Sequence, residues 1–247
     1  MKKAIKERKK TTKIIYSFFK RLFDIIIGIL GIILLIPVSL IVKLINILNK
    51  DFAPIFYSHI RIGKNGKEFR LYKFRSMVPN ADKILKELLK EKKYAEEWKK
   101  NQKFENDPRI TKAGKFLRKS SLDELPQFIN VFKGDMSLIG PRPLLVKYIP
   151  YYSEREQLRH TVRPGITGWA QVHGRNHVLW EERFELDAYY VEHLSLWMDI
   201  RIILTTIKNV LQRKDIEVAP NLMDFDEYRR QQAAGRVFLK VEDAVIK

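Results

Sequence analysis

The chain has 247 residues, 45% of them hydrophobic, with a formal net charge of +18 and a pI near 9.9. This hydrophobic fraction argues against disorder, and the length suits one domain or a small domain with an accessory element. Because there is no cysteine, disulfides, thiolate metal sites and cysteine nucleophiles are excluded. The positive charge indicates an anionic partner, for which nucleic acid, an anionic membrane surface and a phosphorylated substrate are the candidates.

Residues 25–42 form an apolar segment without a single charged residue. Its length is close to the minimum for a transmembrane helix. A buried core helix and a cleaved signal peptide are the alternatives. The signal peptide fits poorly, because the preceding region is long and basic and no small-x-small cleavage site follows. Basic residues flank the segment on both sides: Lys9, Lys10, Lys13, Lys20 and Arg21 before it, and Lys43, Lys50, Arg61, Lys64 and Lys67 after it.

The charges on both flanks indicate that both ends of the apolar segment stay on the cytoplasmic side. A straight span cannot satisfy this condition, whereas a segment that enters the membrane and turns back can. Pro37 lies inside the apolar run, where it removes a backbone donor and disfavours a regular helix. Residues 1–50 are therefore predicted to form a basic N-terminus and a re-entrant membrane helix broken at Pro37, with a kinked spanning helix as the alternative.

Two elements are predicted directly after the anchor. Residues 54–77 predict a β-hairpin, since Asn65-Gly66 is typical of a type I′ turn, whose two central residues need positive φ. Residues 81–103 predict a helix with a charged, solvated face. Four apolar residues share its other face: Ile84, Leu85, Leu88 and Leu89.

The second half of the chain predicts further helices. Gly134 supplies a stop for a segment with apolar residues at helical spacing, namely Leu125, Phe128, Ile129 and Phe132. The sequence GPRP at 140–143 predicts a stiff turn, and the glycine-rich stretch 163–176 predicts a structured loop. Residues 178–212 predict amphipathic helices, and the periodicity beyond Val218 is weak.

Asp123 and Glu124 stand side by side within SSLDELPQFIN, residues 120–130 of a strongly basic chain. A purely structural interpretation exists, because Ser121 and Glu124 have the spacing of a capping box at a helix start. With Ser121 as the cap, Pro126 would fall inside the helix and cost a hydrogen bond, whereas with Asp123 as the cap it falls in the first turn. Either way both carboxylates lie at a helix N-terminus, where the exposed amides favour an ionised Asp123.

The acidic pair also suits nucleophilic or metal-binding chemistry. Two adjacent carboxylates repel each other, and Mg²⁺, which prefers oxygen ligands completed by phosphate and water, would relieve that repulsion. Arginine is the preferred planar donor to phosphate, although each arginine taken singly has a structural interpretation too. Five arginines lie in the surrounding sequence: Arg109, Arg118, Arg142, Arg163 and Arg175.

Other chemistries fit the sequence poorly. His173 and His177 are four residues apart, but Gly174 between them weakens a helix, so a zinc site is disfavoured. The sequence holds no P-loop, no G-x-S-x-G and no G-x-G-x-x-G motif. It also holds no recognisable nucleic-acid-binding module.

Three stretches together resemble a known family: KFRSM (73–77), DPRITKAGKFLRKSSLDELPQFINVFKGDMSLIGPRP (107–143) and RHTVRPGITGWAQVHGRN (159–176). They are similar to the bacterial sugar transferases that charge a polyprenyl phosphate, the monotopic phosphoglycosyl transferases or undecaprenyl-phosphate sugar phosphotransferases. The resemblance runs from about Lys20 to Leu211 and includes the anchor, as in the small, catalytic-core form of the family. Residues 81–103 carry no family signal and are interpreted as a variable insertion.

The resemblance implies a role for each matching residue. Asp123 matches the nucleophilic aspartate and Glu124 its acidic partner, and Mg²⁺, with Mn²⁺ as a substitute, would bridge this site and the diphosphate of a UDP-sugar. Asp123 would attack the phosphorus next to the sugar and release UMP, and a polyprenyl (undecaprenyl) phosphate would then attack the phosphosugar intermediate. The phosphate-binding residues implied are Arg118, Arg142, Arg175, Lys73 and Arg75.

These observations predict a mainly α-helical fold with a small β-hairpin (α+β). Its parts are the anchor (1–50), a cytoplasmic catalytic domain with interfacial amphipathic helices (51–218) and a C-terminal tail (219–247). The predicted partners are a UDP-sugar, a polyprenyl phosphate and the anionic inner leaflet of the bacterial cytoplasmic membrane, without nucleic acid and with a homodimer as one candidate assembly. The implied reaction is the first membrane step of a surface glycan pathway. A membrane-tethered basic binding protein and a phosphohydrolase using the same acidic pair are the alternatives.

Overall fold

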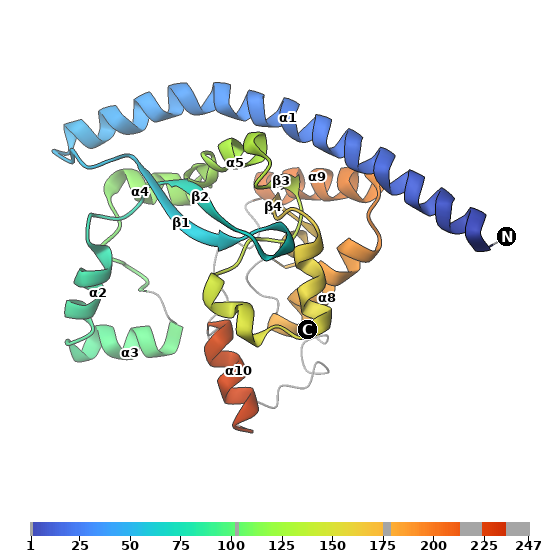
Figure 1. The fold of residues 1–247 in the computed structure, drawn as a ribbon. Helices are drawn as coiled ribbons and strands as arrows, with labels where there is room; N and C mark the ends of the chain where they lie inside the picture. The colour runs from blue at the N-terminus through green and yellow to red at the C-terminus, as the bar shows by residue number, and fades with distance from the viewer. Residues whose placement is uncertain (1, 102–103, 175–178, 213–223, 236–247) are drawn as a thin grey trace.

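The most extended element is α1 (Lys2–Leu48), a helix of 47 residues that arches over the rest of the chain (Figure 1). The computed structural model describes residues 2–101, 104–174, 179–212 and 224–235. Within these ranges, Ile14–Leu48 is the one helical stretch that is long and apolar enough to cross a membrane. The predicted apolar anchor is thus confirmed as a helix.

The interruption predicted at Pro37 is not seen, because α1 continues through this residue and follows a shallow arc (Figure 1). Proline disfavours a helix interior, but packing on both sides can hold the backbone in place. Here Leu35 and Val42, which flank Pro37, are only 6% and 3% exposed. The re-entrant path through a membrane stays a prediction.

The remaining elements form a body beneath α1 that is mainly helical, as predicted. The other α-helices are α2 (Ala81–Leu88), α3 (Lys92–Asn101), α4 (Lys112–Lys119), α5 (Gln127–Lys133), α6 (Glu154–Gln157), α7 (Trp169–Val172), α8 (Trp180–Glu192), α9 (Leu196–Leu211) and α10 (Phe225–Ala233). The 3₁₀ helices are η1 (Lys64–Gly66), η2 (Leu122–Glu124), η3 (Val146–Tyr151) and η4 (Leu158–Thr161). The strands are β1 (Phe56–Ile62), β2 (Glu68–Phe74), β3 (Ser137–Ile139) and β4 (Gly165–Thr167).

Strands β1 and β2 form the predicted hairpin and are antiparallel. Asn65 has φ of 57° and Gly66 has φ of 74°, which is the left-handed pair that a type I′ turn requires. The pairing places Lys73 of β2 opposite Tyr57 of β1, so that both side chains reach the cavity described below. The hairpin prediction is therefore confirmed down to the conformation of its turn.

The single helix predicted over 81–103 is wrong, because the segment forms two helices, α2 and α3. The apolar stripe of α2 ends at Leu89, whereas the aromatic residues of α3, Tyr94 and Trp98, both lie with ring centroids 5.2 Å from that of Phe104. At about 100° per residue, Trp98 falls on the side of the helix opposite to Leu89. A straight helix would point the two apolar sets in different directions, and the chain turns between them instead.

A second sheet consists of β3 and β4, which are parallel and pair Ser137 with Gly165 and Ile139 with Thr167. The loop predicted at 163–176 therefore contains a strand and the one-turn helix α7. A three-residue strand offers too few alternating positions to be identified from a sequence pattern. This sheet brings the turn after β3, which carries Arg142, next to β4 and α7.

The aromatic core explains how α10, part of the predicted tail, joins the body. Phe225 is fully buried and stacks on Tyr152 of the segment after η3, with ring centroids 5.5 Å apart. The other members of this cluster include Tyr148, Trp180, Phe184 and Tyr228. The helices predicted in 178–212 are confirmed as α8 and α9, and α5 ends as predicted at Gly134, whose φ is 88°.

Polar side chains fix α1 to the body. Asp24 is 1% exposed and accepts hydrogen bonds from Ser137 Oγ at 2.9 Å and from the amide of Leu138 at 2.8 Å. One turn earlier, Lys20 Nζ lies 2.8 Å from Asp199 Oδ2 of α9. These contacts set the rotation of α1 about its own axis.

Helix α1 also packs closely on α5. A Cβ atom at Gly31 would lie 2.2 Å from Cγ of Phe128, so this crossing requires glycine. Arg21 donates two hydrogen bonds of 2.8 Å to the carbonyls of Val131 and Phe132, at the C-terminal end of α5, where a cation is favoured. The first helix is thus an integral part of the folded body.

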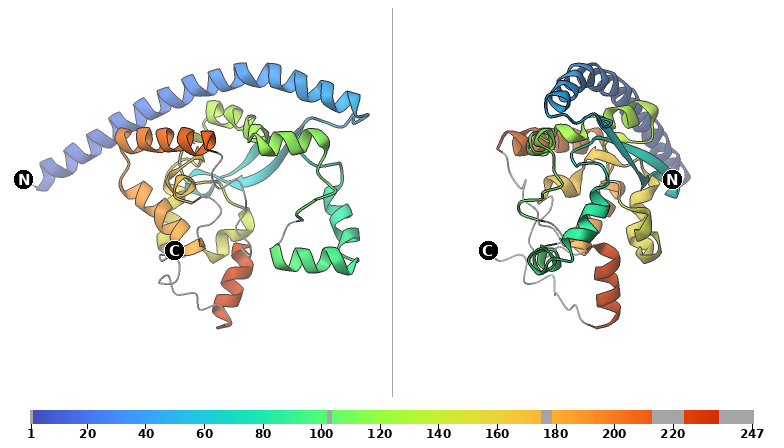
Figure 2. Two further views of the ribbon diagram at one scale, coloured as in Figure 1. Left: turned by 180° about the vertical axis from the view of Figure 1, so that it is seen from behind. Right: turned by 90° about the vertical axis from the view of Figure 1, so that its left-hand side faces the viewer.

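Helices α1, α5 and α9 lie together at one end of the molecule, away from α3 and α10 (Figure 2). This end carries many exposed apolar side chains, including Ile33, Ile36 and Leu40 of α1 and Trp197, Leu204 and Leu211 of α9. Soluble proteins rarely expose contiguous apolar surface on this scale, and such a surface is typical of membrane association.

Candidate active site

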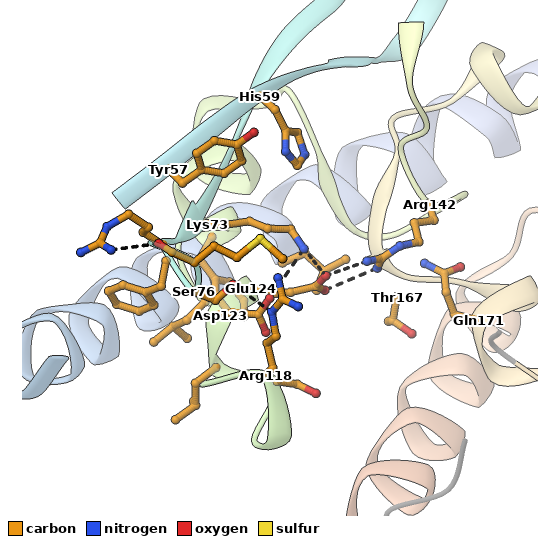
Figure 3. Close-up of a pocket in the computed structure, with 18 of the residues that line it drawn as sticks. Tyr57, His59, Lys73, Ser76, Arg118, Asp123, Glu124, Arg142, Thr167 and Gln171 are labelled. Atoms are coloured by element: carbon orange, nitrogen blue, oxygen red, sulfur yellow. Dashed lines mark hydrogen bonds and ion pairs between the residues drawn. The ribbon is translucent and has the colours of Figure 1, made fainter. Parts of the chain in front are cut away.

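A cavity of about 1090 Å³ opens beneath the hairpin (Figure 3). Strands β1 and β2 supply one wall, η2 and the end of α4 supply the floor, and the GPRP turn with α7 and α9 supplies another wall. Residues 77–82 and two residues of α8, Arg183 and Asp187, also line the cavity. Both residues of the acidic pair line it. Elements that are far apart in the sequence therefore meet around Asp123 and Glu124.

Neither capping role predicted for the acidic pair is seen. Ser121 adopts a left-handed conformation with φ of 57°, whereas a side-chain cap needs an extended residue, and its hydroxyl makes no capping bond. Helix α5 begins only at Gln127, preceded by Pro126, again without a side-chain cap. The left-handed Ser121 turns the chain sharply after α4, so that Asp123 is presented to the cavity on the short helix η2.

Glu124 is held by two cations. Its Oε1 lies 2.7 Å from Lys73 Nζ and 2.7 Å from Nη2 of Arg142, whose Nη1 approaches Oε2 at 3.4 Å. Burial opposes ionisation, but the charges of Arg142 and then Lys73, with their hydrogen bonds, lower the pKa of Glu124 well below its usual range. Glu124 is therefore a permanent anion that fixes two cations at the cavity.

Asp123 differs sharply from its neighbour. Its carboxylate accepts no hydrogen bond from the residues that the structure describes, and its nearest cation is Lys73, with 3.8 Å between Nζ and Oδ2. Burial raises the pKa of Asp123, the charge of Lys73 opposes this rise, and the adjacent charge of Glu124 adds to it. A carboxylate with few partners and a raised pKa is a better nucleophile than one held in a tight ion pair.

The predicted phosphate-binding residues differ in how free their side chains are to bind a ligand. Arg118 lines the cavity, and its Nε donates to Ser76 Oγ at 2.9 Å, which leaves the terminal nitrogens of its guanidinium without a hydrogen bond among the described residues. Arg75 also borders the cavity, but its guanidinium donates to both Asp51 oxygens (2.9 and 2.8 Å) and to the carbonyl of Pro54 at 2.6 Å. These contacts give Arg75 a structural role. Arg175 lies outside the described residues.

The two other arginines named from the sequence have structural partners. Arg109 is buried and forms a two-pronged ion pair with Asp107, with bonds of 2.9 and 2.6 Å. Arg163 donates to the carbonyl of Gly134 at 2.8 Å. Neither lines the cavity.

The donor set at the cavity limits how Mg²⁺ would be held. Within the described ranges, no group of three or more His, Asp or Glu side chains could bind a metal ion. Mg²⁺ commonly uses one or two carboxylates together with substrate phosphates, so the pair is sufficient in number. Asp123 presents unpaired oxygens, whereas Glu124 is occupied by Lys73 and Arg142. The residues fit an ion bound mainly through Asp123 and the phosphates of a bound donor.

Several cavity residues were missed by the sequence analysis, and two of them have an unpaired polar group. His59 of β1 lines the cavity with its Nε2 buried and unpaired, and burial, followed by the charges of Arg61 and Lys73, lowers its pKa to about 4. Gln171 of α7 lines the opposite wall. A lone histidine in a strand and a lone glutamine in a loop carry no spacing signal, so only the tertiary arrangement identifies them.

The chain is similar to a family of known proteins. The family described as "Bacterial sugar transferase" matches residues 15–213. The chain is 47% identical over 197 residues to the "Undecaprenyl-phosphate galactose phosphotransferase" of Salmonella typhimurium, covering 79% of this chain and 41% of that protein. It is 41% identical over 203 residues to the "Uncharacterized sugar transferase EpsL" of Bacillus subtilis, covering 80% and 90%.

A third relative is the "Exopolysaccharide production protein ExoY" of Sinorhizobium fredii, which is 43% identical over 193 residues, covering 77% of this chain and 84% of that protein. The chain therefore spans about two fifths of the Salmonella protein but most of the length of the other two. The matched region contains the cavity and its acidic pair.

Proposed function

Since the chain belongs to the bacterial sugar transferase family, we propose that it transfers a sugar-1-phosphate from a UDP-sugar to a polyprenyl phosphate, such as undecaprenyl phosphate. The observation that carries this proposal is the asymmetry of the acidic pair. Asp123 accepts no hydrogen bond from the described residues and has only a long contact of 3.8 Å with Lys73, while Glu124 beside it anchors Lys73 and Arg142. A nucleophile next to fixed cations suits attack on a diphosphate.

In the first step, a carboxylate oxygen of Asp123 attacks the phosphorus next to the sugar. The bond from that phosphorus to the bridging oxygen breaks, and UMP leaves with the bond's electrons. The sugar phosphate stays attached to Asp123 as an acyl phosphate. Lys73 and Arg142, held by Glu124, lie where they offset the negative charge of the phosphates.

In the second step, a phosphate oxygen of the lipid attacks the same phosphorus. The bond to Asp123 breaks, the carboxylate is restored, and a polyprenyl diphosphate sugar is formed. Two displacements through a covalent intermediate avoid bringing two phosphorylated substrates together at once. A bound Mg²⁺, or Mn²⁺ in its place, would supply charge neutralisation at the donor diphosphate.

The apolar end of the molecule supports a lipid acceptor. Thr206, Asn209 and Val210 of α9 line the cavity, while Leu204 and Leu211 of the same helix are 61% and 78% exposed. One helix thus faces the cavity on one side and presents apolar side chains on the other. We place this surface against the inner leaflet of the bacterial cytoplasmic membrane, with the cavity on the cytoplasmic side, because the flanks of α1 are basic.

The decisive experiment is a panel of UDP-sugars with undecaprenyl phosphate and Mg²⁺, monitored for UMP. We expect one or more donors to release UMP, and mass spectrometry of protein quenched without the lipid to find a sugar phosphate on Asp123. Asp123→Asn should abolish both signals. Asp135→Asn, beyond the C-terminal end of α5 and outside the cavity lining, is the matched control and should retain them.

Two outcomes would contradict the proposal. Full turnover by Asp123→Asn would remove the proposed nucleophile. Release of sugar phosphate into water at the same rate with and without the lipid would indicate a phosphohydrolase.

A further inference from the structure

The wall of the cavity formed by β4, α7 and α9 is uncharged. Its polar members are Thr167, Gln171, Thr206 and Asn209, and its other members are apolar, namely Ile166, Ala170, Val172 and Val210. Figure 3 shows Thr167 and Gln171 beside Arg142, at the edge of the charged part of the site. The cavity therefore has a charged part around the acidic pair and a neutral part next to it.

Most polar groups of the neutral wall already have partners. The hydroxyls of Thr167 and Thr206 lie 2.7 Å apart, and Thr206 Oγ1 also donates to the carbonyl of Ile202 at 2.7 Å. Asn209 Nδ2 donates to the carbonyl of Val172 at 3.4 Å. These side chains hold β4, α7 and α9 together.

Gln171 is the exception. Both of its side-chain polar atoms, Nε2 and Oε1, are buried and have no hydrogen-bond partner among the residues that the structure describes. Buried polar groups are nearly always paired, so an amide with two orphaned atoms in a cavity calls for a ligand. Of the described residues that line this cavity, His59 is the one other with an orphaned buried polar atom, and it lies on the hairpin wall.

The backbone holds the amide of Gln171 in place. A Cβ atom at Gly168 would lie 2.6 Å from Gln171 Oε1 and 2.2 Å from the carbonyl oxygen of Gly140. Only glycine therefore fits at position 168 while the side chain of Gln171 lies where it does. Gly140 is two residues before Arg142, which binds Glu124. The turn that carries Arg142 therefore packs against the start of α7, the helix that carries Gln171.

The side-chain amide of glutamine is uncharged and offers two N–H hydrogen-bond donors and one acceptor oxygen. It therefore suits a neutral ligand group that can both donate and accept hydrogen bonds. In a nucleotide sugar, the diphosphate is matched by the cations of the site, and two neutral parts remain: the sugar hydroxyl or acetamido groups and the imide edge of uracil. We propose that Gln171 binds this uncharged part of the donor and thereby determines which nucleotide sugar is accepted. This inference rests on the proposed transferase function.

The test compares Gln171→Met, which keeps the length of the side chain but removes its hydrogen bonds, with Gln157→Met, an exposed control on α6. We expect Gln171→Met to raise the KM for the preferred donor about tenfold, the loss of one good hydrogen bond. Its thermal midpoint without donor should equal or exceed that of the wild type, because an apolar group replaces an unpaired buried amide. A purely structural glutamine would instead lower the midpoint. Gln157→Met should change neither quantity.

A donor panel identifies which part of the nucleotide sugar Gln171 binds. If it contacts the sugar, Gln171→Met will alter the ranking of UDP-sugars that differ at one hydroxyl or acetamido group. If it contacts the base, the variant will alter the ranking of UDP- against CDP- and dTDP-linked forms of one sugar. Gln171→Glu, which keeps the shape but loses a donor, should change the same ranking.

The inference is overturned if both Gln171 variants keep the donor ranking and keep KM within twofold of the wild type. It is overturned equally by a drop in thermal midpoint with unchanged kinetics. Failure of the proposed function looks different, since the wild type itself would then release no UMP from any donor, and the inference would fall with it.

Discussion

Lys73 Nζ lies 2.7 Å from Glu124 Oε1, and this contact ties strand β2 to η2, the short helix that carries Asp123, the proposed nucleophile. Replacing Glu124 with glutamine keeps the shape but releases two cations, Lys73 and Arg142, toward Asp123. An Asp123 carboxylate held by both cations is a weaker nucleophile. We expect Glu124→Gln to slow single-turnover UMP release about a hundredfold.

The control for this measurement is Glu68→Gln, an exposed glutamate at the start of the same strand. It should leave the rate unchanged. A rate for Glu124→Gln within threefold of the wild type would show that the ion pair has no part in the chemistry.

The two carboxylates should affect stability in opposite directions as pH changes. Burial raises the pKa of Asp123, so at pH values between its ordinary and its raised pKa the folded protein keeps a proton there that the unfolded chain has lost. The stability that this proton provides is present below the ordinary carboxyl range and is lost as pH rises through the raised pKa. We expect Asp123→Asn to melt above the wild type near pH 7.5, with the gap closing toward about pH 4.

The pKa of Glu124 is lowered overall, because Arg142 and Lys73 outweigh the effect of burial. Its contribution to stability is therefore present above the ordinary carboxyl range and lost on acidification. Glu124→Gln should melt below the wild type near neutral pH, and the gap should begin to narrow only below about pH 4, as pH falls toward the lowered pKa of Glu124. Melting curves of both variants from neutral pH to below about pH 4 check the signs. Parallel curves for the two variants would mean that the carboxylates do not differ as described.

Substitutions of two arginines that border the same cavity should affect different quantities, one the stability of the fold and the other the binding of the donor. Arg75 is nearly buried and bonds to Asp51 and to backbone carbonyls, so Arg75→Lys should lower the free energy of unfolding by about 2 kcal/mol. Arg118→Lys should change that free energy by less than about 0.5 kcal/mol but raise the donor KM roughly tenfold. Denaturant titration and initial rates measure the two effects. The reverse pattern would make Arg75 the phosphate ligand.

The attachment of α1 through Asp24 predicts a coupled effect. Removing this buried acceptor leaves Ser137 and the amide of Leu138 unpaired, so Asp24→Ala should destabilise the detergent-solubilised protein by roughly 3 kcal/mol. Asp24→Asn keeps one acceptor oxygen and should cost about half as much. A double-mutant cycle with Ser137→Ala should show less than additive loss. Strict additivity would mean that the two side chains act independently.

Elements with a local signal could be predicted from the sequence. The type I′ turn depends on Asn65 and Gly66 alone, and the stop of α5 depends on Gly134, so both predictions hold. The segment 81–103 was predicted as one helix because its many charged residues obscure the point where the apolar residues move to another side of the helix, between α2 and α3. Strand β4 has three residues, and only its pairing with β3 identifies it as a strand.

Residues of the candidate site also differ in whether the sequence alone could identify them. The acidic pair and Arg142 were identified within their motifs, and Lys73 by resemblance. The backbone that presents the acidic pair was not foreseen, because the left-handed conformation of Ser121 arises where α4 meets η2. Gln171 could not be identified from the sequence, since the lack of a hydrogen-bond partner for its amide depends on the fold around Gly168 and Gly140. The uninterrupted course of α1 likewise comes from burial on either side of Pro37, which the sequence does not reveal.

The bonds from Asp24 and Lys20, together with the close crossing at Gly31, remove the freedom of α1 to roll or slide on the body. An α-helix turns by about 100° per residue, so a shift of one residue would turn Gly31 away from α5 and drive bulky aliphatic groups into α5. In the proposed orientation on the membrane, the height of Asp123 above the bilayer is therefore fixed by the fold. A lipid phosphate that diffuses in the plane of that membrane would then always meet Asp123 at the same depth.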